Sequence, residues 1–154
     1  MKKKLIIITT ICFVIDLITK LLVSNFLVDN SIVIIPKFFS LKFVKNTGAA
    51  FSILQGKTIV LVSVALITVI YLFFMIKKNK LSNLETIGYS LFLAGIMGNL
   101  IDRICYGYVI DFLHFYIGNN SFPIFNFADI CITIGAGLLL LNIIKESKNE
   151  NSGR

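Results

Sequence analysis

The sequence predicts an all-α integral membrane protein with four transmembrane helices, a small extracytoplasmic β-sheet and an outer loop rich in aromatic side chains. Composition is the first reason, since 56% of the 154 residues are hydrophobic and the mean hydropathy is +0.87. A soluble domain of this length needs more polar surface to face water. The second reason is that the apolar residues gather into four long runs, and the third is that lysines flank these runs.

The four apolar runs are the expected helices, and they cover about residues 5–24, 58–76, 84–101 and 125–144. About 20 residues at 1.5 Å each cross a hydrocarbon core of about 30 Å. The run at 58–76 contains no charged residue. The segments between the runs are too short to form cores of their own. We therefore expect residues 1–154 to form a single membrane-embedded domain.

Basic residues predict the orientation. They lie before the first run, between the second and third, and after the fourth, and these three places share one side if the chain crosses four times. They are Lys2, Lys3, Lys4, Lys77, Lys78, Lys80, Lys145, Lys148 and Arg154. The positive-inside rule makes that side cytoplasmic, so both termini are expected inside and both longer connections outside. Because the charges flank apolar runs, the net charge of +7 indicates anchoring, and no nucleic-acid partner is predicted.

The first run resembles a secretory signal peptide, since three lysines precede it. Asp16 and Lys20 interrupt it, and no small-x-small cleavage site follows. We therefore expect an uncleaved first helix.

The outer connections predict a sheet and an aromatic loop. In the first, over about residues 30–56, Phe39, Leu41 and Phe43 alternate with polar residues and are expected to share one face of a strand. The turn residues 46–48 follow, and Ala49-Ala50-Phe51 is expected to resume a strand. The second connection, before Pro123, is rich in Tyr and Phe, which favour the membrane interface. The tail at about 146–154 is polar and predicted to be disordered.

Asp129 is the most informative polar residue, because it lies inside an apolar run. A carboxylate there costs about 2.5–3.5 kcal/mol even on the lenient insertion scale, so it usually faces protein or water and serves a function. Asn126 shares its helix face at i, i+3. Asp111 lies upstream on the same side of the membrane. Two carboxylates that converge at a wet membrane edge indicate acid/base catalysis on a water molecule.

Other polar residues are expected to support this site. Asp16 and Lys20 are four apart on the first helix, so a structural ion pair is favoured over a direct catalytic role. Asn99 shares a helical stripe with Arg103 at i, i+4 and also meets Asp102 at i, i+3, whereas the side chains of the adjacent Asp102 and Arg103 diverge. Arg103 is expected either to reach the lipid headgroups or to bind a phosphate or peptide carbonyl.

No metal or cofactor is predicted. Cys12, Cys105 and Cys131 form no CxxC pair and no even disulfide framework. Cys131 is expected to be a small buried residue turned away from the Asp129 face. His114, the only histidine, either tunes the site or simply lies at the interface.

Two other functions compete with catalysis. Intramembrane acids and Lys20 could form a proton relay in a small transporter, or the polar groups could only tie helices together. A conduit needs polar residues through the full depth of the membrane, whereas these crowd the outer third. Proton flux in liposomes would favour the transporter, and unchanged precursor processing after loss of the protein would favour a structural bundle.

Five ordered motifs resemble the prolipoprotein signal peptidase family, also called signal peptidase II, of bacterial plasma membranes. They are DLITK at 16–20, NTGAAF at 46–51, GNLIDR at 98–103, GYVIDF at 107–112 and FPIFNFAD at 122–129. Each is weak alone, but their order over nearly the whole chain is specific. Leu17 stands where the family often has Gln, and Ala94 where Gly is usual.

The resemblance implies an aspartic endopeptidase that cuts diacylglyceryl-modified prolipoproteins just before the lipidated Cys, without a metal. Asp111 and Asp129 would be the catalytic pair, about 3 Å apart and sharing one proton. It further implies membrane lipids as surroundings, the cyclic peptide globomycin as an inhibitor, and a monomer. The remaining matched residues would bind substrate (Asn46, Gly48, Asn99, Arg103 and Asn126) or support the site (Asp16, Lys20 and Asp102).

Overall fold

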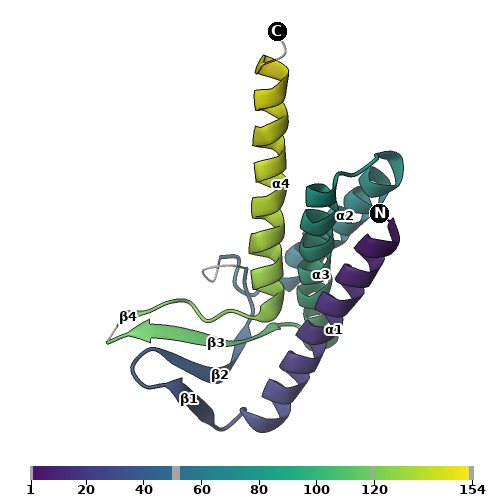
Figure 1. Ribbon diagram of the computed structural model, residues 1–154. Helices are drawn as coiled ribbons and strands as arrows, with labels where there is room; N and C mark the ends of the chain where they lie inside the picture. Colours follow the sequence, from purple (N-terminus) through teal and green to yellow (C-terminus); the bar gives the residue numbers. More distant parts are fainter. Residues whose placement is uncertain (1, 50–52, 119, 153–154) are drawn as a thin grey trace.

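The structure is a computed structural model that describes residues 2–49, 53–118 and 120–152. Four long helices stand side by side, and a small antiparallel sheet crosses one end of the bundle (Figure 1). We call this end the sheet end and the opposite end the far end. The helices are α1 (Lys2–Phe26), α2 (Thr58–Lys78), α3 (Asn83–Tyr106) and α4 (Phe127–Ser152), and the strands are β1 (Ser31–Ile35), β2 (Phe39–Asn46), β3 (Val109–Ile117) and β4 (Asn120–Ser121).

All four helices are long and apolar enough to span a membrane, which confirms the predicted fold class. Their outer surfaces are apolar, as lipid contact requires. On α2, for example, the Ile59 side chain is 83% exposed and Leu72 is buried. The chain is therefore a multi-pass membrane protein.

Helix α3 is the centre of the bundle and packs against the other three helices. Small residues permit the close contact between α3 and α4. A Cβ atom on Gly95 would collide with the carbonyl oxygen of Ala128, and one on Gly135 would lie 2.6 Å from the Phe92 amide nitrogen. Between helices that are surrounded by lipid, this close backbone approach replaces the hydrophobic driving force of soluble cores.

The sheet has the strand order β1-β2-β3-β4. Its apolar core joins the end of α1 to β3 through Val23, Leu27, Ile110 and Phe112. The segment predicted as an aromatic loop thus supplies two of the four strands. Its rings stack across the sheet, as between Phe39 and Phe115 at 4.5 Å.

A register shift in β2 changes which side chains share a face. Leu41 pairs with Leu113, but the next described pair in the ladder is Val44 with Asp111. The extra residue is a β-bulge, which reverses the alternation of faces along the strand. The shift interrupts the regular alternation predicted for Phe39, Leu41 and Phe43, although Leu41 and Phe43 both pack against the same apolar core.

The predicted disordered tail is also wrong as far as the structure describes it, since α4 continues through Ser152. Asn142 donates a hydrogen bond to Glu146 at 2.9 Å, an i, i+4 pair of the kind that carries a helix beyond its apolar run. Residues 153–154 lie outside the described residues. So do Ala50 and Phe51, for which the sequence predicted a resumed strand.

Candidate active site

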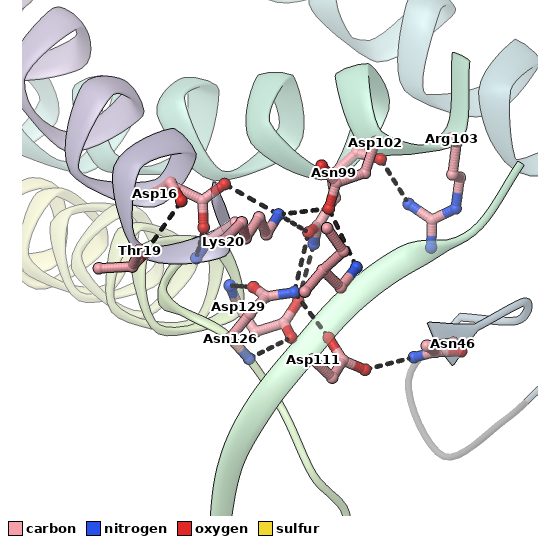
Figure 2. Close-up of polar contacts among 12 residues, drawn as sticks. Asp16, Thr19, Lys20, Asn46, Asn99, Asp102, Arg103, Asp111, Asn126 and Asp129 are labelled. Carbon is pink, nitrogen blue, oxygen red and sulfur yellow. Dashed lines mark hydrogen bonds and ion pairs between the residues drawn. The ribbon is translucent and has the colours of Figure 1, made fainter. Parts of the chain in front are cut away.

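Asp129 is fixed at the start of α4 by a reciprocal cap. The Asn126 side-chain oxygen accepts a hydrogen bond from the Asp129 backbone N–H at 2.9 Å, and Asp129 Oδ2 accepts one from the Asn126 backbone N–H at 3.1 Å (Figure 2). This capping box satisfies N–H groups that the first turn of a helix leaves free. The Asp129 side chain therefore lies at the positive end of the helix dipole.

Asp111 comes from β3 and reaches the same place. Asn126 Nδ2 donates to Asp111 Oδ1 at 2.7 Å, and Asn46 Nδ2 donates to Asp111 Oδ2 at 2.8 Å. The Asp111 side chain is only 2% exposed. Burial, and then the nearby charge of Asp129, raises the pKa of Asp111 to about 7, although both amide donors act in the opposite direction. The structure thus provides a carboxyl group that can hold a proton near neutral pH.

The β-bulge brings Asn46 to Asp111. Asn46 pairs with Val109, two residues before Asp111 on β3, so both lie on one face of the sheet. Without the extra residue in β2, Asn46 would point to the opposite face.

Asn99 on α3 connects Asp129 to Lys20 and to Asn126, the residue that also contacts Asp111. Its Nδ2 donates to Asp129 Oδ1 at 2.8 Å, while its Oδ1 accepts from Asn126 Nδ2 at 3.1 Å and from Lys20 Nζ at 3.0 Å. Because Lys20 can only donate, it fixes the amide orientation in which the Asn99 NH₂ group points at Asp129.

The predicted ion pair of Asp16 and Lys20 is present, at 2.8 Å, and Lys20 also lies 3.0 Å from Asp102. Both carboxylates reach further elements. Asp16 Oδ1 accepts from the Ala128 N–H at 2.8 Å, and Asp102 Oδ2 accepts from the Ile110 N–H at 3.0 Å. This buried cluster therefore joins α1, α3, α4 and β3 behind the two aspartates (Figure 2).

Arg103 binds the backbone of the turn that follows β2. Its Nη2 donates to the Gly48 carbonyl oxygen at 2.8 Å, and its Nη1 donates to the Asn99 carbonyl oxygen at 3.3 Å. The Gly48 N–H in turn donates to Asn46 Oδ1 at 2.9 Å. The guanidinium thus binds two carbonyl oxygens of the chain itself, and its role towards headgroups or substrate stays a prediction.

Asp111 and Asp129 face one cavity of about 710 Å³. Asn46, Asn99 and Arg103 line its polar end. The rest extends along α2 and α4 and is apolar, with Leu61, Val64, Ala65, Thr68, Ile130 and Thr133 among its walls. The site is therefore a small polar end attached to a long apolar compartment.

Two of the five predicted substrate-binding residues lie behind this cavity rather than in its wall. Asn126 is fully buried, and the Gly48 carbonyl is occupied by Arg103. They hold Asp111 and the β2 turn in place.

The sequence reasoning missed the α2 wall. The residues that form this wall follow the i, i+3, i+4, i+7 pattern of one helix face; they are Leu61, Val64, Ala65 and Thr68. Because α2 is apolar on every face, the sequence does not distinguish the face that lines the cavity from the faces that contact lipid.

His114 lies away from the carboxylates. Its ring is placed between the hydroxyl groups of Ser40, at 3.0 Å, and Ser121, at 2.8 Å, and so links three strands. Across the described residues, no three His, Cys, Asp or Glu side chains gather as metal ligands.

The chain is similar to known proteins over most of its length. Residues 8–145 match the family model described as signal peptidase (SPase) II. The chain belongs to this family. A protein named lipoprotein signal peptidase from Clostridium tetani is 39% identical over 95% of this chain and 96% of its own. One from Symbiobacterium thermophilum is 41% identical over 90% and 93%.

A solved structure shares this fold. A bacterial membrane enzyme superposes with a TM-score of 0.86 and 34% identity, covering 94% of this chain and 90% of that one. As a signal peptidase II family member, the protein is a peptidase, and its polar network lies in the segment that the family model matches.

Proposed function

We propose that this peptidase removes signal peptides from diacylglyceryl-modified bacterial prolipoproteins by cutting just before the lipidated Cys, with Asp111 and Asp129 as the catalytic pair. The observation that carries the proposal is that both carboxylates face one cavity that is polar at their end and apolar beyond. An apolar compartment beside the dyad suits a substrate whose acyl chains stay in the bilayer while its peptide bond meets water.

The chemistry follows from the two environments. Asp129, which accepts hydrogen bonds from Asn126 and Asn99 at the helix start, acts as the general base. Asp111, whose pKa is raised to about 7, carries the proton. Asp129 takes a proton from water as the water oxygen bonds to the scissile carbonyl carbon, and Asp111 donates its proton to the oxygen that becomes negative.

The tetrahedral intermediate then collapses. Asp129 gives the proton it received to the leaving nitrogen, the C–N bond breaks, and Asp111 regains a proton from the hydroxyl group that becomes the new carbonyl. The pair returns to its starting state with one proton, and the titration belongs to the pair rather than to either residue.

The membrane placement completes the proposal. The chain lies in the bacterial plasma membrane with both termini cytoplasmic and the sheet end outside, as the lysine distribution indicates. The buried charged residues of the described chain, Asp16, Lys20, Asp102 and Asp111, belong to the network at the sheet end. This concentration supports a site at the outer rim over a proton conduit.

The test uses detergent-purified protein and a diacylglyceryl-modified precursor. Asp111→Asn and Asp129→Asn should each reduce cleavage by roughly three orders of magnitude or more. Asp29→Asn is the matched control, since Asp29 is exposed at the same end of the molecule. Globomycin should inhibit the wild type, and a chelator should not. Near-normal cleavage by either dyad variant would refute the assignment, and equal cleavage of a precursor with an unmodified Cys would refute the substrate class.

A further inference from the structure

A second cavity lies at the far end of the bundle and is surrounded by lysines. It measures about 270 Å³. Its walls include Lys2 from the start of α1 and three lysines from the end of α2 and the connection that follows, with two apolar side chains beside them. These residues are Lys2, Lys77, Lys78, Lys80, Ile76 and Leu81. Figure 1 places the start of α1 next to the α2–α3 connection, away from the sheet.

The connection that carries these lysines is held at both ends. At the end of α2, the backbone N–H and the side-chain Nδ2 of Asn79 both donate to the Met75 carbonyl oxygen, at 3.1 and 3.0 Å. At the start of α3, Ser82 and Glu85 form a capping box. Leu81 between them is buried. The lysine backbones are thus fixed in place, and a ligand would order only their side chains.

Among the described residues, no acidic side chain forms an ion pair with these lysines. The ion pairs of the described residues both involve Lys20, at the other end of the bundle. Glu85, the nearest acid in sequence, accepts a hydrogen bond from the Ser82 N–H at 2.7 Å as part of the cap. Lys2 Nζ reaches the Lys77 carbonyl oxygen at 3.4 Å, so α1 brings its charge to the same cavity. Such an arrangement favours an anionic ligand.

We propose that this cavity binds the headgroup phosphate of an anionic phospholipid. The inference rests on the membrane orientation proposed above and not on the catalytic assignment. The cavity lies where the apolar span of α2 ends, at the depth of the lipid headgroups. Ile76 and Leu81 form an apolar wall that can contact the glycerol and the first acyl carbons of a lipid. Free phosphate has no such groups. Basic pockets between helices on the cytoplasmic side have this chemistry.

The competing explanation is that these lysines act only as diffuse topological charge. Two charge-matched variants separate the explanations. Lys77→Gln/Lys80→Gln removes two charges from the cavity, and Lys145→Gln/Lys148→Gln removes two exposed charges from the end of α4. The assay is native mass spectrometry of the full chain in detergent, titrated with phosphatidylglycerol, phosphatidylcholine or inorganic phosphate. Circular dichroism confirms that each variant keeps its helices.

The wild type should retain one phosphatidylglycerol in preference to phosphatidylcholine. Each cavity lysine removed should weaken retention about fivefold, so the double variant should lose roughly 25-fold. The α4 variant should change less than twofold. Equal losses in both variants would overturn the proposal in favour of diffuse charge, and absence of lipid preference in the wild type would overturn it outright. Inorganic phosphate that displaces the lipid at equal concentration would show an anion site without lipid specificity and would also contradict it. Precursor cleavage is not the readout, so failure here leaves the catalytic proposal untouched.

Discussion

Replacing Lys20 by Met should destabilise the protein severely, because the Lys20 ammonium is the shared cation of two buried carboxylates. Met keeps most of the aliphatic volume of the side chain and removes only the charge and its donors. The Lys20 side chain is 2% exposed, and those of Asp16 and Asp102 are 1% and 3% exposed. Two buried carboxylates would then face each other without compensation.

Breaking such a pair from one side costs about 3–5 kcal/mol. Catalysis should suffer separately, because Asn99 loses the donor that holds its NH₂ group towards Asp129. The equilibrium unfolding of purified protein in mixed micelles measures the first effect, and kcat/KM measures the second. Lys4→Met is the matched control on the same helix, where the lysine is exposed and the expected change is within about 0.5 kcal/mol.

A second substitution isolates the interaction between Lys20 and Asp102. In Lys20→Met/Asp102→Asn the formal charge of the cluster returns to −1, and the Asn side-chain oxygen can still accept from the Ile110 N–H. The double variant should therefore recover part of the stability, with a coupling of about 1–3 kcal/mol. If Lys20→Met unfolds like the wild type, or if the two substitutions simply add, the ammonium does not hold this cluster together.

Three further predictions test other parts of the site. The pKa of Asp111 is raised from 3.8 to about 7, so between these pH values the folded state binds a proton that the unfolded state releases. The free energy of unfolding should therefore fall as pH rises from about 4 to 7. Asp111→Asn should flatten this pH dependence in unfolding measured from pH 4 to 8, and an unchanged pH dependence would contradict the prediction. Gly98→Ala should destabilise the protein, since the new Cβ would collide with Asp16 Oδ2, whereas Gly137→Ala, with nothing within 4 Å, should be neutral or stabilising in the same unfolding assay. Arg103→Lys should lower kcat/KM at least about tenfold, because the single lysine nitrogen does not reproduce the bridge that Nη1 and Nη2 make between two carbonyls. A lysine variant with wild-type kinetics would show that the positive charge alone is sufficient.

The sequence by itself determined the features that depend on neighbours along the chain. Four spans follow from the length of apolar runs, because a helix that satisfies its own backbone needs only about 20 such residues to cross lipid. The Asp16–Lys20 contact follows from i, i+4 spacing, and the Asn126–Asp129 contact from i, i+3. The structure has both.

Other features depended on where distant segments meet, and the tertiary structure alone decided them. Asn46 faces Asp111 only because a bulge in β2 reverses the alternation of side chains between the two faces of the sheet. The alternating pattern of residues 39–45 does not predict this extra residue. The link from Lys20 through Asn99 to Asp129 crosses three helices. Periodicity reports which face of an element is apolar, but it does not report the register or depth at which two faces meet, because those are fixed by packing over the whole bundle.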